Sequence, residues 1–368
     1  MLSTYSSSET TSSSNYPILG MIGCGNIGQR QAANFIKHGY KVYVYDINSD
    51  VMAKLQSQGA FLTQSCAEVG RYAEVIFTAL PTPPDVIKAV LEGEKSLTQG
   101  LRSGSIYIDI STNSPETILK LHQAMAQRGV EMLDAPFNDC PVGAYSHNGM
   151  GLAVMASGSQ QTFERVQDLL ALMADRVLYC GDIGNGTRCK LIHNAVNATT
   201  VQAVSEGITL GLAQGIPLEI IWDTLRFGSF GQNAGDIHGL PYYWFSRRFD
   251  DLNQHPAFTV KLLHKDLRLA VNLATERNIS VPHLSLSLQD YQEAEARGFS
   301  NYSTTKIISL QEERAGVIAQ GNVPIQPSLS QPLSQPVTSP KNKFSLSIVV
   351  ILIVLSNLLQ LGFYCLIK

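Results

Sequence analysis

Up to about residue 182, short runs rich in β-branched and aromatic residues alternate with longer stretches that have helical periodicity. The strand-like runs are residues 16–22, 41–45, 75–80, 105–110, 131–134, 152–156 and 177–180. Alternation of strands and helices is typical of a mainly parallel sheet with helices on both faces. The pattern therefore predicts a doubly wound α/β domain over residues 16–182.

The pattern changes near residue 187. Strand-like runs disappear from there on, and one long helix is expected at about 187–214. We predict a second, all-helical domain over residues 183–318. A cleft between two such domains is the expected place for a small-molecule substrate.

The two ends of the chain are unlike its middle. Residues 1–15 are mostly Ser and Thr without an apolar core, which predicts a disordered tail. Residues 319–343 are rich in Pro, Ser and Gln, the composition of a flexible or partly polyproline linker.

Residues 344–367 run for 24 positions without a formal charge. As a helix this run would be about 36 Å long, enough to cross a hydrocarbon core of about 30 Å. Lys341 and Lys343 precede it and only Lys368 follows, which places the folded region in the cytoplasm by the positive-inside tendency. The run predicts a single-pass C-terminal transmembrane helix and a membrane location.

A buried or partner-binding helix is the alternative for the same run. Ser356, Asn357 and Gln360 cluster on one helical face and dilute its hydrophobicity. No compact domain follows the linker that would bury such a helix, so the membrane anchor is preferred.

Charge and cysteine usage exclude other classes of protein. The formal net charge of −3 gives no electrostatic case for nucleic-acid binding. The cysteines are scattered, at positions 24, 66, 140, 180, 189 and 365. They lack metal-ligand spacing, so no metal site is predicted and a reducing compartment is indicated.

A glycine-rich turn follows the first strand-like run and opens the first helical stretch. Its candidate cofactor-binding residues are Gly23, Gly25, Asn26, Ile27 and Gly28. The first glycine permits a tight turn, the second lets the backbone approach a pyrophosphate, and the third lets helix and strand pack closely. The helix N-terminus offers unpaired N–H groups to the phosphates. The arrangement is the dinucleotide-binding fingerprint, which makes the first domain Rossmann-type.

Asp46 ends the second strand-like run. A carboxylate there accepts hydrogen bonds from the adenosine ribose hydroxyls and repels a 2′-phosphate. The residue therefore favours NAD over NADP as cofactor. Cys24, inside the glycine turn, is interpreted as a small filler and not as a nucleophile.

Two further loops come directly after strand-like runs. One contains Leu80, Pro81 and Thr82, and the other contains Ser111 and Thr112. Loops at the carboxyl ends of parallel strands bind ligands in this architecture. Both loops are therefore expected to face the cofactor or the substrate.

The chemistry is expected at the start of the long helix. Lys190, His193 and Asn194 have the spacing that places three side chains on one helical face. A lysine that is partly desolvated in a cleft can exchange a proton with a substrate hydroxyl. Asn194 would hold the substrate oxygen and His193 would orient or polarise it. An isolated helical lysine is also often just a solvated charge, so the spacing alone leaves both interpretations open.

Together these motifs resemble the β-hydroxyacid dehydrogenase family, which includes 3-hydroxyisobutyrate dehydrogenase and is related to 6-phosphogluconate dehydrogenase. The similarity extends from residue 17 to about 315. It rests on the glycine turn, the loops at Leu80–Pro81–Thr82 and Ser111–Thr112, the Asp134–Ala135–Pro136 sequence, the segment with Gly184, Gly186, Lys190 and Asn194, and Lys265–Asp266–Leu267.

The resemblance implies a role for each matching position. Lys190 would be the general acid/base, and Lys265 would approach the cofactor as the cleft closes. Leu80, Pro81 and Thr112 would contact the cofactor, and Ser111 the substrate. The family also implies a homo-oligomer formed through the helical domains.

The substrate loop departs from the family pattern. After Asp-Ala-Pro the family usually continues with an apolar residue, Ser and two Gly, where this chain has Phe137, Asn138, Asp139 and Cys140. Asn138 can still donate a hydrogen bond to a substrate, but an ionised Asp139 would repel a carboxylate. Asn197 replaces the glutamate of the phosphogluconate enzymes, so 6-phosphogluconate is not expected.

Two functions follow from these observations. The first is an NAD-dependent oxidoreductase that transfers a hydride between the cofactor and a small 3-hydroxy acid or related semialdehyde. The second is a membrane-tethered NAD-binding sensor or scaffold without catalysis. The altered loop and the predicted anchor favour the second. We prefer the enzyme, because a non-catalytic protein has no physical need for Lys190, Asn194 and Lys265 together.

Overall fold

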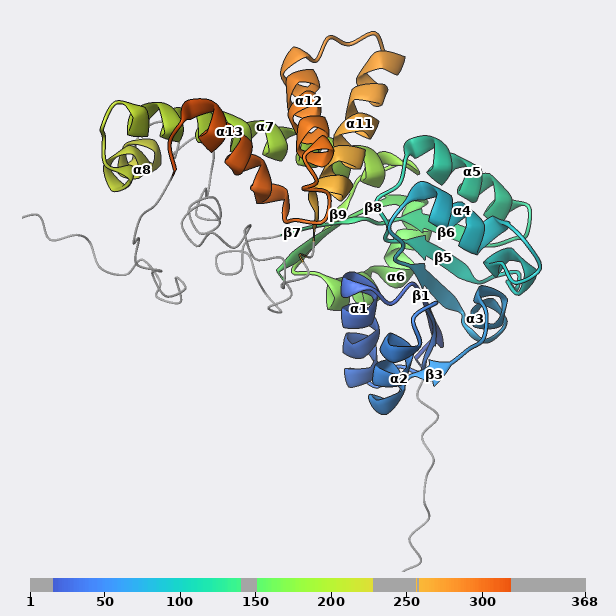
Figure 1. The fold of residues 1–368 in the computed structure, drawn as a ribbon. Coiled ribbons are helices and arrows are strands. Elements are labelled where there is room, and N and C mark those ends of the chain that lie inside the picture. The colour runs from blue at the N-terminus through green and yellow to red at the C-terminus, as the bar shows by residue number, and fades with distance from the viewer. Residues whose placement is uncertain (1–15, 140–150, 228–255, 257, 319–368) are drawn as a thin grey trace, which may run out of the picture. The chain divides into compact units, whose positions relative to one another are not determined.

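The computed structural model describes residues 16–139, 151–227, 256 and 258–318 (Figure 1). They lie in one compact unit, Met1–Ile325, whereas the second unit, Gln326–Lys368, lies outside the described residues. The strands are β1 (Leu19–Ile22), β2 (Val42–Tyr45), β3 (Phe61–Leu62), β4 (Val75–Thr78), β5 (Ile106–Asp109), β6 (Glu131–Asp134), β7 (Phe137–Asp139), β8 (Leu152–Gly158) and β9 (Arg176–Tyr179). The helices between them are α1 (Asn26–Lys37), α2 (Ser49–Ser57), α3 (Cys66–Tyr72), α4 (Pro83–Leu91), the short η1 (Leu97–Gln99), α5 (Pro115–Ala126) and α6 (Gln160–Met173).

The described strands form one sheet in the order β3-β2-β1-β4-β5-β6-β8-β7, with β9 paired to β8. All pairs from β3 to β6 are parallel, and β8 runs antiparallel to β6 and β7. β1 lies between β2 and β4, so the chain leaves β1 in one direction and later returns on its other side. In open α/β sheets, ligands bind at such a switch point, outside the carboxyl ends of the strands on either side, which here are β1 and β4.

Side chains along each strand alternate between two hydrophobic cores. On β4, Val75 and Phe77 pack in the core that includes α1, α2 and α6, whereas Ile76 packs in the core that includes α3, α4 and α5. Because successive residues of a strand point to opposite faces, both faces of the sheet are apolar and both are covered by helices. The predicted Rossmann-type, mainly parallel sheet is confirmed.

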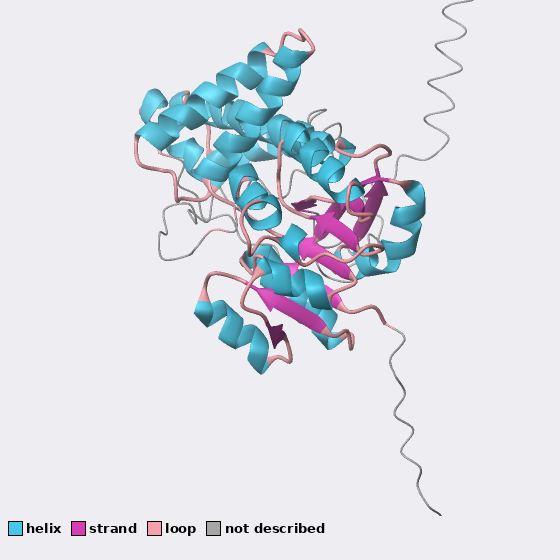
Figure 2. Cartoon of the chain, turned by 90° about the vertical axis from the view of Figure 1, so that its right-hand side faces the viewer, coloured by secondary structure: helices cyan, strands magenta, loops and turns pink. Residues whose placement is uncertain are grey.

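Beyond β9, the described regular elements are helices. They are α7 (Asn185–Ala213), α8 (Leu218–Phe227), α11 (Val260–Glu276), α12 (Pro282–Ala296), the short η3 (Thr304–Ile307) and α13 (Ile308–Ala315). Leu191, Ile208, Trp222, Leu263 and Tyr291 lie in a core of their own, separate from the two cores of the sheet. Figure 2 shows that the strands gather in one part of the chain and that the other part contains helices. The predicted change from α/β to all-α is therefore confirmed, and the exact domain boundary near residue 182 stays a prediction.

The transmembrane part of the predicted fold class is wrong. Within residues 16–139, 151–227 and 258–318, no helix is both long enough and apolar enough to cross a membrane. The longest helix, α7, has 29 residues but carries Arg188, Lys190 and Glu206 along its length. The predicted anchor at 344–367 lies outside the described residues, and the prediction rested on length and missing charge alone. The membrane location and the cytoplasmic orientation depended on that helix and are withdrawn with it.

One part of the sheet differs from the sequence prediction. β7 has three residues and pairs antiparallel with β8, through Phe137 opposite Val154. A strand this short gives too little alternation to be predicted from its pattern. The hairpin matters because it places residues 137–139, the altered part of the substrate loop, on the edge of the sheet.

Candidate functional site

The glycine turn has the geometry that a dinucleotide needs. Gly23 has φ of +83°, and a Cβ there would stand 2.4 Å from the carbonyl oxygen of Ala79. A Cβ on Gly28 would stand 1.9 Å from the carbonyl oxygen of Gly23. Around the Cβ position of Gly25, in contrast, no described atom lies within 4 Å. Two glycines are thus required for packing, and the middle one leaves open space in front of the backbone.

The first turn of α1 supports the same interpretation. Asn48, Ser65, Thr82, Ser114 and Ser159 each cap the following helix by accepting a backbone N–H. No described side chain caps α1, and its first turn contains no acidic residue. Asn26 and Ile27, the first residues of this helix, therefore present backbone N–H groups in the direction where Gly25 leaves room. The residues fit a dinucleotide pyrophosphate.

Asp46 is held against the glycine turn. Its Oδ2 accepts a hydrogen bond of 2.5 Å from the backbone N–H of Cys24, and its Oδ1 accepts one of 2.8 Å from the N–H of Asn48. The carboxylate is thus fixed at the end of β2 beside the turn. Burial and the neighbouring carboxylate raise the pKa of Cys24 to about 12, which agrees with a filler and not a nucleophile.

The two predicted loops are tied to each other. The Ser111 hydroxyl accepts a hydrogen bond of 2.9 Å from the backbone N–H of Leu80 and donates one of 3.3 Å to the carbonyl oxygen of Thr78. Below them, Asp109 is fully buried and accepts hydrogen bonds from Thr78 and Asn113. The Ser111 hydroxyl therefore links its own loop to the loop after β4. Its contact with substrate stays a prediction.

Lys265 connects a helix of the all-α part to these loops. Its Nζ donates hydrogen bonds to the carbonyl oxygens of Pro81, at 3.2 Å, and Thr112, at 2.9 Å. The same ammonium group forms an ion pair with Asp266 at 3.3 Å, and the Lys265 side chain is only 11% exposed. Three residues that the sequence assigned to the cofactor from separate motifs are brought into direct contact.

Asn194 and His193 join this group from α7. The Asn194 amide is buried and donates a hydrogen bond of 2.8 Å to Asp266, whose carboxylate is completely buried. His193 is exposed and its Nδ1 lies 3.2 Å from Oδ1 of Asn194. A chain of polar contacts therefore runs from His193 through Asn194 and Asp266 to Lys265.

Lys190 lies one turn before Asn194 on α7, and its Nζ donates a hydrogen bond to the carbonyl oxygen of Phe137. This places the ammonium group at the start of β7, beside Asn138. The Asn138 amide is buried, its Nδ2 lies 3.5 Å from the sulfur of Met155, and its Oδ1 has no partner among the described atoms. The Lys190 ammonium group is thus held at the backbone next to Asn138, the residue that the sequence assigned to the substrate.

A buried carboxylate supports the start of α7. Asp134 ends β6 and accepts hydrogen bonds of 2.7 Å from the backbone N–H and 2.8 Å from the hydroxyl of Thr187. Burial, with the nearby Asp109 adding to it, raises the pKa of Asp134 to about 7. Gly186 completes the contact, because a Cβ there would stand 2.2 Å from the carbonyl oxygen of Met155.

Sequence reasoning missed three parts of this arrangement. The sequence motif included Asp266 but did not predict that its carboxylate binds both Lys265 and Asn194. Its position directly after Lys265 was a signal for the first of these contacts. Asp134 was noted without a role, because nothing in the sequence shows that it meets Thr187. The acceptor for Lys190 is the backbone of Phe137, and a backbone carbonyl leaves no mark in a sequence.

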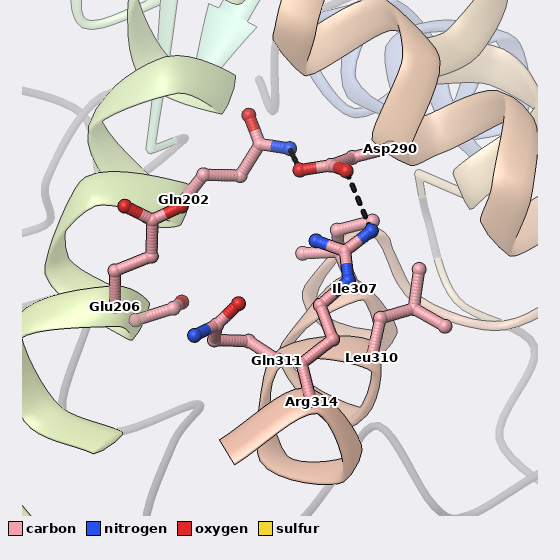
Figure 3. A pocket seen from close by; sticks show the side chains of 8 residues that line it. Gln202, Glu206, Asp290, Ile307, Leu310, Gln311 and Arg314 are labelled. Carbon is pink, nitrogen blue, oxygen red and sulfur yellow. Dashed lines mark hydrogen bonds and ion pairs between the residues drawn. The ribbon is translucent and has the colours of Figure 1, made fainter. Parts of the chain in front are cut away.

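A small pocket elsewhere lies between α7, α12 and α13, and none of the candidate residues lines it. Figure 3 shows Asp290 between Gln202 and Arg314. The hydrogen bonds to Asp290 are 2.7 Å from the Gln202 amide and 2.8 Å from the Arg314 guanidinium. Asp290 is thus paired with groups of the neighbouring helices, so we assign the pocket to the packing of the helices and not to the candidate site.

Two family models match consecutive parts of the chain. Residues 18–181 match the NAD binding domain of 6-phosphogluconate dehydrogenase, and residues 184–311 match the NAD-binding domain of NADP-dependent 3-hydroxyisobutyrate dehydrogenase. The chain belongs to the β-hydroxyacid dehydrogenase family. The boundary between the two matches falls just before α7, which carries Lys190.

Relatives of this family member are enzymes. It is 26% identical over 303 residues to 2-(hydroxymethyl)glutarate dehydrogenase of Eubacterium barkeri, covering 82% of this chain and 97% of that one. It is 29% identical over 304 residues to the mitochondrial 3-hydroxyisobutyrate dehydrogenase of Mus musculus, covering 80% and 87%. In fold it is similar to 3-hydroxyisobutyrate dehydrogenase of Mycobacterium tuberculosis, solved with L-serine, with a TM-score of 0.68, 22% identity and coverage of 80% and 98%.

From these matches, the chain is an NAD(P)-dependent dehydrogenase or reductase that acts on hydroxy acids at a CH–OH group. They favour the enzyme over the membrane-tethered scaffold. The two family models give a nicotinamide cofactor without choosing between NAD and NADP. Solved structures with a similar fold include complexes with each of the two.

Proposed function

We propose that the chain is an NAD-dependent dehydrogenase or reductase of a small 3-hydroxy acid or the corresponding semialdehyde, with Lys190 as general acid/base. One observation carries the proposal. Lys190 and Asn194 lie one turn apart on α7, and Asn194 is linked through Asp266 to Lys265, whose ammonium group lies on the loops after β4 and β5. A proton-transfer group and a cofactor-facing group are thereby held on one rigid frame.

The residues divide the reaction between them. Bound NAD+ supplies the hydride acceptor. Lys190 takes the hydroxyl proton as the alcohol is oxidised and returns it when a carbonyl is reduced. The Asn194 amide is fixed by Asp266, so it can hold the substrate oxygen without rearranging. Holding the substrate between these two groups gives the alignment that hydride transfer needs.

The position of Asp46 supports NAD over NADP. Its carboxylate is fixed by Cys24 and Asn48 at the end of β2, the position that accepts hydrogen bonds from the ribose hydroxyls. A 2′-phosphate in that place would meet a fixed negative charge and would not be bound. Replacement of Asp46 by a small neutral residue should relax the rejection of NADP.

The substrate is proposed to carry an anionic group that one or two carbons separate from the reacting carbon. Relatives are named for 3-hydroxyisobutyrate, 2-(hydroxymethyl)glutarate and 3-sulfolactaldehyde, which all carry a carboxylate or a sulfonate. In this chain Asn138 stands where the family usually has a serine, and its Oδ1, which has no partner among the described residues, supports a role in binding the substrate. The altered loop is therefore proposed to change which acid is bound and not the reaction.

A substrate panel tests the proposal. The purified chain is assayed with NAD(H) and with NADP(H) against the three relatives' substrates, their oxidised or reduced partners, and hydroxy acids of neighbouring length. We expect turnover of at least one 3-hydroxy acid or semialdehyde, with NAD(H) preferred. NADH binding without turnover across the panel would leave a nucleotide-binding protein and would refute the proposed function.

A further inference from the structure

Two residues on one segment hold two residues on α7. Asp134 at the end of β6 binds Thr187, and the carbonyl oxygen of Phe137 accepts a hydrogen bond from Lys190. Thr187 and Lys190 are three positions apart on α7, and residues three apart on a helix lie on the same face. The segment 134–137 therefore holds the first two turns of α7 at two successive points.

The first of these points is a dense polar contact. Asp134 uses both carboxylate oxygens on Thr187, and its Oδ2 also accepts a hydrogen bond of 3.2 Å from the Ser157 hydroxyl. Ser157 in turn accepts one of 2.9 Å from the backbone N–H of Gly186. Asp134, Ser157 and Thr187 are all buried. The position of the helix start is fixed by these bonds and by the absence of a Cβ at Gly186.

We propose that Asp134 is a positioning residue for the reaction: its carboxyl group fixes the first turn of α7 and thereby sets where the Lys190 ammonium group stands relative to the substrate. The inference rests on the proposed role of Lys190. It assigns to the Asp of the Asp-Ala-Pro sequence a task in proton transfer that does not require contact with substrate. A displacement of about 1 Å at a reacting group can lower a rate by about 100-fold.

The charge of Asp134 makes this hold sensitive to pH. Its surroundings include Asp109 and Tyr107 on β5 and Cys180 after β9, and none of these groups carries a positive charge. With a pKa of about 7, the carboxyl changes charge near neutral pH. Hydrogen bonds to an ionised carboxylate are stronger than those to a neutral acid, so the hold on Thr187 weakens as the pH falls below about 7.

Three variants separate positioning from folding. Asp134→Asn removes the negative charge. It also replaces one of the two carboxylate oxygens that accept from Thr187 by an NH2 group, which cannot accept. Thr187→Val removes the hydroxyl bond of 2.8 Å and keeps the backbone bond, and Thr187→Ser restores both. Each is measured for kcat across pH 5.5–9, for NADH affinity by fluorescence, and for the rate at which acetic anhydride modifies Lys190, read by peptide mass spectrometry.

We expect Asp134→Asn to lower kcat by about 10- to 100-fold and Thr187→Val by about 3- to 10-fold, with NADH affinity unchanged within about two-fold. Thr187→Ser should stay close to the natural enzyme. In Asp134→Asn, the change of kcat with pH near pH 7 should be lost. Lys190 should be acetylated several times faster in Asp134→Asn than in Thr187→Ser.

Unchanged kcat, pH profile and acetylation rate in Thr187→Val and in a folded Asp134→Asn would overturn the proposal. If Asp134→Asn fails to fold, the comparison of kcat and of the Lys190 acetylation rate between Thr187→Val and Thr187→Ser decides whether the proposal holds. If the natural chain shows no turnover, the proposed function fails, and the acetylation rate of Lys190 still decides whether Asp134 positions it.

Discussion

At the scale of single residues, the same residue type has different tasks in neighbouring positions. Gly28 is required because a Cβ there would overlap the carbonyl oxygen of Gly23, whereas a Cβ on Gly25 would meet no described atom. Asp46 is held just beyond the end of β2 by backbone N–H groups, whereas Asp134 is buried and has its pKa raised to about 7. What each residue does is therefore set by its surroundings and is open to separate tests.

The two glycines give a matched pair of variants. Gly28→Ala places a Cβ about 1.9 Å from a carbonyl oxygen and should lower the free energy of unfolding by about 3 kcal/mol. Gly25→Ala meets no described atom and should change that free energy by less than about 1 kcal/mol. It should still weaken NADH binding at least about ten-fold, because the methyl group occupies the space proposed for the pyrophosphate. Urea unfolding and NADH fluorescence titration measure both effects, and normal NADH binding by Gly25→Ala would contradict the cofactor site.

Asp134 should make folding stability depend on pH. Its pKa is raised from 3.8 to about 7 in the folded chain, so the folded state binds more protons than the unfolded state between about pH 4 and pH 7. Stability contributed by the protonated acid is therefore lost as the pH rises through this window. Since one pKa unit corresponds to about 1.36 kcal/mol, the loss is roughly 4 kcal/mol.

The comparison that isolates this contribution is the natural chain against Asp134→Asn. The difference between their free energies of unfolding should fall by roughly 4 kcal/mol from pH 4 to pH 8. Carboxyl groups that do not interact with Asp134 are present in both chains and cancel. A difference that stays constant with pH would show that Asp134 ionises normally.

At the scale of elements, the site depends on how α7 and α11 meet the carboxyl edge of the sheet. α7 is attached through Thr187 and Lys190 to the segment after β6, and α11 is attached through Lys265 to the loops after β4 and β5. Each loop residue was assigned correctly to that edge from its place after a strand-like run. The contacts between elements were not, because they depend on the packing of segments more than 50 residues apart in the chain.

Lys265→Met tests the attachment of α11. It removes two hydrogen bonds to the loops and leaves the buried Asp266 carboxylate without its cation. Breaking a buried ion pair is costly, so the melting temperature should fall by several degrees and NADH affinity by about ten-fold. Lys261→Met, at an exposed position of the same helix, is the control and should change neither. Equal behaviour of the two variants would show that Lys265 does not contact the cofactor.

At the scale of the whole molecule, the sequence predicted the order of α/β and all-α parts because hydrophobic periodicity is a local property. The glycine turn could be assigned for the same reason. The short hairpin of β7 and β8 and the buried partners of α7 could not, because three residues give no period and a buried carboxylate looks like any other aspartate. The transmembrane prediction was wrong in relying on an uncharged run alone, and no helix within the described part of the chain can cross a membrane.

The expected homo-oligomer also belongs to this scale. α7 exposes Ile192, Val196 and Leu210, which are 59%, 57% and 64% exposed within the described part of the chain. An apolar stripe of this kind on a long helix is a common place for contact with a second copy. Val196→Glu with Leu210→Glu should reduce the mass measured by light scattering, and Gln123→Glu on α5 should not. A mass of one monomer for the natural chain would contradict the expected homo-oligomer.

The central claim is that Lys190 transfers the proton while the nicotinamide cofactor transfers the hydride. The most direct test compares kcat of the natural chain and of Lys190→Met on the best substrate of the panel, with NADH affinity measured alongside. The account predicts that kcat falls by about 100- to 10,000-fold while NADH affinity changes by less than about two-fold. A Lys190→Met enzyme that keeps kcat within a few-fold of the natural chain would contradict it.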